Sequence, residues 1–203
     1  MTPTHHRTTI SEAADRLTYE LPGHRVEILQ GRLTATPPAD GSHALSLSRL
    51  IEKFYDAGAR KAGLRYVQGI GLRLPTGSDD YAIPDFALVE ADFRDHKVQK
   101  NCYAADVFRL VVEVTSSNWS DDIGVKVDSY AKADIPVYVI ADRHHDEAVL
   151  CSDPRNGAYR LRRTYKRGES IPLPRSIGVS VDLPVDLLLD GDEHREPDSS
   201  QAM

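Results

Sequence analysis

The sequence predicts an α/β fold in which a mixed β-sheet is flanked by helices, in the order αβββαβ, with an N-terminal hairpin before it and strand additions after it. Two amphipathic helical patterns, at residues 42–63 and 120–133, are separated by three runs with the character of strands. A strongly apolar run, VYVIAD, follows the second helical pattern. Helices and strands that alternate in this way are typical of one sheet with helices packed on it.

The N-terminal region predicts a short helix, a hairpin and a first long helix. SEAADRLTYE opens with Ser11, a residue type that caps helices. RVEILQGRLTATP forms two extended runs around a Gln30–Gly31 turn, and Glu27 lies in the first of them. From Ser42 onward, leucines, isoleucine and aromatic residues recur at near-helical spacing, with Gly63 as the expected stop.

Three strands are predicted between the two helical patterns. LRYVQGIGLRLP alternates as a strand does, YAIPDFALVE follows the turn-forming PTGSDD, and FRLVVEVTS is the third. Pro84 interrupts the second strand and has no N–H to donate to a sheet. We therefore expect Pro84 to lie at a sheet edge or at a bulge.

The second half of the chain predicts a helix followed by more strands. In SDDIGVKVDSYAKA, Ser120 is the candidate cap, and acidic residues in the first turn suit the helix dipole. Pro136 precedes VYVIAD, which is apolar enough to be a buried strand. EAVLCS and AYRLRRTYK predict more exposed antiparallel strands.

Composition is that of an ordinary globular protein. Of the 203 residues, 40% are hydrophobic and 28% charged, so we expect one domain over residues 1–189. Residues 190–203 carry five acidic residues and one arginine, which predicts a disordered tail. No apolar run reaches the roughly 20 residues of a membrane span, and the first residues lack a signal-peptide core. These observations predict a cytoplasmic protein that has no membrane partner.

A carboxylate stands in the middle of the third predicted strand, where a buried strand normally carries only apolar side chains. Glu113 lies between Val112 and Val114, and an ionised carboxylate buried without a partner costs several kcal/mol. Arg109, on the same strand face, is one candidate partner. A divalent cation is another, because Asp85 provides a second carboxylate on a neighbouring strand and Mg²⁺ prefers carboxylate oxygens.

The second helix offers a cation for the same region. Asp122, Lys126 and Tyr130 recur every four residues and so form one polar stripe along the helix. Lys126 can then point back toward the two carboxylates. The alternative is a solvated lysine that pairs with Asp122 one turn earlier.

Several of these motifs occur in a recurrent order: PD at Pro84–Asp85, EVTSSNWSDDIGVK at residues 113–126, and YAKADIPVYVIAD at residues 130–142. A hairpin glutamate, a glycine turn and a histidine at the start of the first long helix precede them, at Glu27, Gly31 and His43. This set resembles the Uma-two endonuclease family, a branch of the PD-(D/E)XK nuclease superfamily. The similarity runs from about residue 19 to about residue 189.

The resemblance implies a restriction-endonuclease-like core and hydrolysis of DNA phosphodiester bonds with Mg²⁺, or with Mn²⁺ in its place. It also suggests a homodimer. By the same resemblance, Asp85 and Glu113 hold the metal together with the backbone carbonyl of Val114, and Lys126 orients the attacking water and stabilises charge on the phosphate. Glu27 and His43 complete the catalytic set. Where the superfamily's simplest pattern has its lysine, this chain has Thr115, so the lysine role passes to Lys126 on the helix.

Charge leaves a second function open. The net charge of −6 is unfavourable for a nucleic-acid binder, but residues 154–175 contain seven basic residues and one acidic residue, a local net of 7 − 1 = +6. The run YRLRRTYKRG, with Tyr159 and Tyr165, offers phosphate contacts or is simply the solvated face of an outer strand. The alternative to an endonuclease is therefore a non-catalytic nucleic-acid or protein-binding module on the same fold.

Overall fold

A six-stranded mixed sheet forms the centre of the computed structural model, which describes residues 8–115 and 119–191. β9 and β10 are parallel, and every other neighbouring pair in this sheet is antiparallel. The α/β class and the mixed sheet are therefore as predicted. In spatial order, the strands of this main sheet are β12 (Ala158–Lys166), β11 (Glu147–Arg155), β10 (Val137–Asp142), β9 (Phe108–Val114), β6 (Phe86–Glu90) and β3 (Leu64–Val67).

A second sheet contains the N-terminal hairpin. Gln30 and Gly31 both have positive φ, 50° and 73°, as a two-residue hairpin turn with the twist of its strands requires. The hairpin is therefore confirmed. In spatial order this sheet contains β2 (Arg32–Thr36), β1 (Arg25–Leu29), β5 (Tyr81–Ala82), β4 (Gly71–Arg73), β8 (Cys102–Tyr103) and β7 (Lys97–Gln99).

Two runs that were each predicted as one strand, the second with an interruption at Pro84, are divided between the two sheets, and this corrects the sequence analysis. The first becomes β3 and β4, with Gly69 between them at a φ of 65°. The second becomes β5 and β6, and the break falls at Pro84, which has no N–H for a ladder hydrogen bond. The division matters for function because Asp85 lies at the break, where the chain passes from one sheet to the other.

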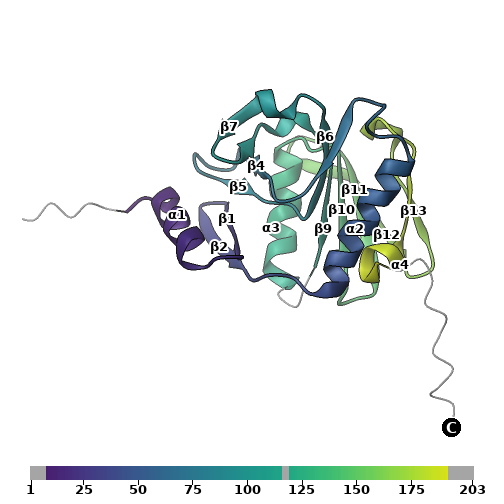
Figure 1. The fold of residues 1–203 in the computed structure, drawn as a ribbon, viewed down its shortest axis with the longest axis horizontal. Helices are drawn as coiled ribbons and strands as arrows, with labels where there is room; N and C mark the ends of the chain where they lie inside the picture. The colour runs from purple at the N-terminus through teal and green to yellow at the C-terminus, as the bar shows by residue number, and fades with distance from the viewer. Residues whose placement is uncertain (1–7, 116–118, 192–203) are drawn as a thin grey trace, which may run out of the picture.

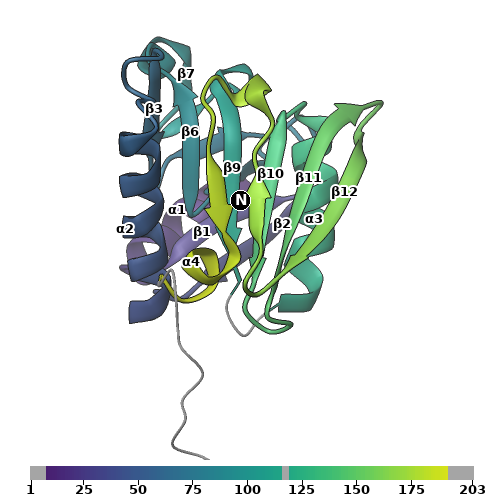
Figure 2. The same cartoon turned by 90° about the vertical axis from the view of Figure 1, so that its right-hand side faces the viewer.

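Helices cover both faces of the main sheet (Figures 1 and 2). Along β9 the side chains alternate: Leu110 and Val112 pack in one apolar cluster with Leu50 and Phe54 of α2, whereas Val111 packs in the other with Tyr130 of α3. The helices are α1 (Ile10–Glu20), α2 (Gly41–Asp56), α3 (Trp119–Lys132) and α4 (Val185–Asp190). A small sheet of β13 (Ser170–Pro172) and β14 (Asp182–Pro184), which was not predicted, leads into α4.

Three predicted helix boundaries are wrong. Thr9, not Ser11, caps α1, and it forms a reciprocal capping box with Glu12. The first long helix ends at Asp56 rather than near Gly63, because the backbone turns at Gly58, whose φ is 75°. α3 begins at Trp119, so Ser120 is inside the helix and is not its cap.

The chain ends are described only in part. α4 extends to Asp190, so the expected domain limit at residue 189 falls within its last turn, and the predicted disordered tail lies almost wholly outside the described residues. Among the described residues, no helix is both long and apolar enough to cross a membrane.

Stability should depend on the apolar cluster that contains β9. Leu110 is fully buried against α2, so we expect Leu110→Ala to lower the free energy of unfolding by about 2–5 kcal/mol. Leu161 on β12 is an exposed leucine and provides the matched control, for which Leu161→Ala should change stability by less than about 0.5 kcal/mol. Urea unfolding of both variants measures the difference, and equal losses would contradict this account of the core.

Candidate active site

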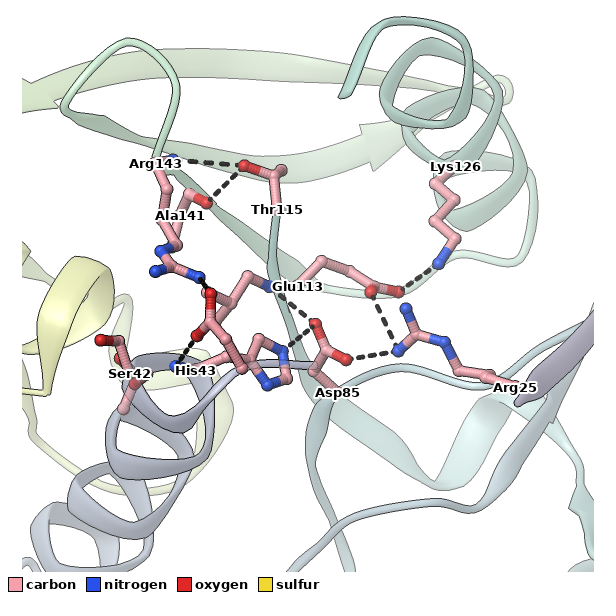
Figure 3. A network of polar contacts seen from close by, with 12 residues as sticks. Arg25, Ser42, His43, Asp85, Glu113, Thr115, Lys126, Ala141 and Arg143 are labelled. Carbon is pink, nitrogen blue, oxygen red and sulfur yellow. Dashed lines mark hydrogen bonds and ion pairs between the residues drawn. The ribbon is translucent and has the colours of Figure 1, made fainter. Parts of the chain in front are cut away.

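The five side chains predicted to form the catalytic set meet at one place. Figure 3 shows His43, Asp85, Glu113 and Lys126 of this set. Three carboxylates converge there: Glu27 from β1, Asp85 from the turn before β6, and Glu113 from β9. His43 comes from the first turn of α2, and Lys126 from α3. All five side chains are buried. Residues from five separate segments thus share one polar cluster, which we call the carboxylate cluster.

Strand pairing explains how Asp85 reaches Glu113. β6 and β9 run antiparallel with Phe86 opposite Val112, so Asp85 lies level with the end of β9. There its Oδ2 accepts a hydrogen bond of 2.8 Å from the backbone N–H of Val114. By the alternation of β9, Glu113 shares the face of Val111, which is the face covered by α3.

α3 holds one oxygen of Glu113 with two side chains that are one turn apart. Lys126 Nζ lies 2.9 Å from Glu113 Oε1, and the Tyr130 hydroxyl donates to the same oxygen at 2.8 Å. Lys126 Nζ also lies 3.2 Å from Glu27 Oε1, an oxygen that accepts a hydrogen bond from the N–H of Ile83. Lys126 therefore bridges two of the three carboxylates.

These contacts decide two alternatives that the sequence left open. Arg109 is not the partner of Glu113, because its Nε donates to Glu90 at 2.6 Å. Lys126 is not a solvated surface lysine, although the side chain of Asp122 lies outside what the structure describes. Tyr130, which lies on the predicted polar stripe but was not predicted as a site residue, contacts the central carboxylate.

His43 is held by the start of α2. Its Nε2 lies 3.1 Å from Asp85 Oδ2, and its backbone N–H donates to the capping side chain of Asp40 at 2.8 Å. Arg143, in the turn after β10, donates to the other oxygen of Asp40 at 2.8 Å. The position of the imidazole is therefore set by a cap that is itself anchored to the main sheet.

Arg25, like Tyr130, is a residue of the site that the sequence analysis did not identify. Its Nη1 donates to Asp85 Oδ1 and lies 3.7 Å from Glu113 Oε2, while its Nε lies 3.8 Å from Glu27 Oε2. Figure 3 shows the guanidinium reaching between Asp85 and Glu113. A signal existed, since Arg25 precedes Glu27 by two residues and so shares its face of the strand.

Burial and charge act against each other in the carboxylate cluster. Burial alone would raise the pKa of Asp85, but the hydrogen bond from His43 and the charge of Arg25 outweigh it and lower this pKa to about 2. Burial raises the pKa of Glu113, against the opposing charges of Lys126 and Arg25. Burial would lower the pKa of Lys126, but Glu113 and Glu27 raise it instead. Lys126 is thus a cation at neutral pH.

The donor set suits a hard divalent cation. Three carboxylates face two permanent cations, and Glu27 Oε2 is buried without a hydrogen-bond partner. Carboxylate oxygens are the ligands that Mg²⁺ prefers. As the side chains are placed here, no group of three or more His, Cys, Asp or Glu residues among those described could hold a metal ion, and the Arg25 guanidinium occupies the space between Asp85 and Glu113. Val114 contacts Asp85 through its N–H, so the ligand role of its carbonyl stays a prediction.

The tyrosines of the basic segment pack against the protein. Tyr165 is buried with the Arg163 guanidinium 4.8 Å above its ring, and the Tyr159 hydroxyl donates to the carbonyl of Ile135 at 2.9 Å. They are therefore held within the fold rather than presented to a nucleic-acid base. Arg160 and Arg162 on β12 are exposed.

Comparison with known proteins adds independent information. Residues 12–186 match the model of a family named Uma2, described as "Putative restriction endonuclease". Among solved structures, the chain is similar to "a putative nuclease belonging to DUF820" from Anabaena variabilis, with a TM-score of 0.64 and 13% identity over 81% of this chain and 89% of that one. At this identity the similarity supports the fold alone. No curated protein matches the chain significantly.

Proposed function

Since the chain belongs to the Uma2 family, we propose that it is a magnesium-dependent DNA endonuclease, which hydrolyses phosphodiester bonds with a metal-activated water. The observation that carries this proposal is the meeting of Asp85, Glu113 and Lys126 in one buried cluster with surplus negative charge. A surplus of carboxylates around lysine is the arrangement expected where a divalent ion and a phosphate bind together.

Each residue has a distinct role in this proposal. Asp85 and Glu113 hold Mg²⁺ with the carbonyl of Val114, and Mn²⁺ can replace Mg²⁺. When bound, the ion supplies Lewis-acid polarisation of the phosphate and a lowered pKa for its water. Lys126, fixed between Glu113 and Glu27, orients the attacking water and offsets charge on the phosphate. Through its contact with Asp85, His43 positions that carboxylate.

The proposal extends to substrate and assembly. A duplex has two strands, so a homodimer would supply one site for each strand, and the expected location is the cytoplasm. The exposed arginines of β12, Arg160 and Arg162, are available for sequence-independent contacts with phosphates.

The test is nicking of supercoiled plasmid during a Mg²⁺ titration, with wild type and Asp85→Asn purified in parallel. We expect metal-dependent nicking by wild type and a loss of roughly 10²-fold or more in Asp85→Asn, because the amide is neutral and is a poorer metal ligand. Asp79, a half-buried aspartate in the loop between β4 and β5 and outside the carboxylate cluster, provides the control, and Asp79→Asn should nick as wild type does.

The outcomes separate the two functions. Equal nicking by wild type and Asp85→Asn would mean that the activity does not come from this site. Binding of DNA by all three proteins, without metal-dependent nicking by any, would instead favour the non-catalytic binding module.

A further inference from the structure

Arg25 occupies the place that the proposed function assigns to a metal ion. Its Nη1 contacts Asp85 Oδ1 and lies 3.7 Å from Glu113 Oε2, and these two carboxylates are the proposed metal ligands. A divalent ion that binds both would have to share that space with a guanidinium of the same sign. The two cations therefore compete for the same oxygens.

Arg25 must remain close to the carboxylate cluster if the complex with metal ion and phosphodiester is to be electrically neutral. With His43 left out of the count, Glu27, Asp85 and Glu113 contribute −3 when ionised and Arg25 and Lys126 contribute +2, so these five side chains have a net charge of −1. A divalent ion would change this to +1, and a phosphodiester would bring it to zero. Arg25 is thus needed for neutrality in the complete complex, but not at its present position.

The two cations differ in how firmly they are held. Lys126 is buried, with a side-chain exposure of 6%, and lies within 3.2 Å of two carboxylates. Arg25 has a side-chain exposure of 24%, its Nη1 donates a hydrogen bond to Asp85, and its buried Nε has no hydrogen-bond partner. Arg25 can therefore move toward solvent, and its fork of N–H donors is well matched to phosphate oxygens.

We propose that Arg25 is the internal counter-ion of Asp85 and Glu113 in the metal-free protein, and that it yields these oxygens to the divalent ion and turns to the phosphate of the substrate. This inference rests on the proposed function. It makes Arg25 a competitor of the metal before DNA binds and a substrate-binding group afterwards. The protein thereby avoids an uncompensated cluster of carboxylates when no metal is bound.

The first experiment measures Mg²⁺ binding without DNA by calorimetry, in wild type, Arg25→Met and Arg109→Met. Arg109 is the matched control because it also pairs with a carboxylate of the main sheet, Glu90, outside the carboxylate cluster. Arg25→Met should bind Mg²⁺ more tightly than wild type by roughly tenfold or more, and Arg109→Met should bind as wild type does. In plasmid nicking, Arg25→Met should show a raised KM for DNA at saturating Mg²⁺.

A second measurement on wild type keeps the inference testable if Arg25→Met does not fold. In ¹⁵N NMR spectra of arginine side chains, the Nε–Hε signal of Arg25, identified by its absence in Arg25→Lys, should shift on addition of Mg²⁺ alone. The Arg109 signal should not move. An unchanged Arg25 signal at saturating Mg²⁺ would overturn the inference.

The results of these experiments distinguish a failure of this inference from a failure of the proposed function on which it rests. If wild type binds Mg²⁺ and Arg25→Met binds it no more tightly, Arg25 is not a competitor and the inference fails alone. If neither protein binds Mg²⁺ or Mn²⁺, the proposed metal-dependent function fails as well.

Discussion

Replacing Glu113 by glutamine is expected to lower the rate of Mg²⁺-dependent plasmid nicking by roughly 10³-fold. The amide keeps the shape of the side chain and can still accept the hydrogen bond from Tyr130, but it removes the charge that pairs with Lys126 and with the proposed metal. The same change should remove the Mg²⁺-dependent rise in melting temperature, because a ligand that binds only the folded state stabilises it.

Glu90→Gln provides the control for Glu113→Gln. Glu90 is also on the main sheet and pairs with Arg109, but it lies outside the carboxylate cluster. This variant should nick plasmid and respond to Mg²⁺ as wild type does. If Glu113→Gln nicked at the wild-type rate, or kept its full Mg²⁺-dependent thermal shift, the assignment of Glu113 would be wrong.

Replacing Lys126 by methionine is expected to lower the rate of cleavage at saturating Mg²⁺ by roughly 10²- to 10³-fold. Methionine fills most of the space of the lysine stem but leaves Glu113 and Glu27 without the cation between them. An uncompensated buried charge costs about 3–5 kcal/mol, so the variant should also melt at a lower temperature. Since the lost cation repels the metal, Mg²⁺ binding should be retained or strengthened, whereas cleavage is lost.

That divergence between metal binding and cleavage separates a catalytic lysine from a purely structural one. Single-turnover cleavage below the melting temperature gives the rate, and calorimetry gives the affinity for Mg²⁺. Lys132→Met is the matched control, because Lys132 lies on the same helix and pairs with Asp128 on the exposed surface. A folded Lys126→Met protein that cleaves within about twofold of wild type would exclude the proposed role.

Local patterns predicted most helices and strands, because the formation of these elements depends on residues that are close together in the chain. The alternation in RVEILQGRLTATP and the Gln30–Gly31 pair predicted the hairpin, and the apolar spacing after Ser42 predicted α2. The division of two strands between sheets was not predicted, since the runs on either side of Pro84 look alike in sequence. Which sheet each half joins depends on partners that are distant in the chain.

The sequence by itself determined the family, the α/β class and the side chains that carry charge into the core. A carboxylate in a β-branched run, such as Glu113, requires a compensating charge or hydrogen bond wherever the strand lies. Only the tertiary structure decided which cations compensate the Glu113 carboxylate. Arg109, four residues before Glu113, pairs with Glu90, while Lys126 from α3 and Arg25 from the hairpin contact Glu113. The physical reason is that ionic contacts act over a few ångströms in space, and the adjacency of strands and helices sets those distances.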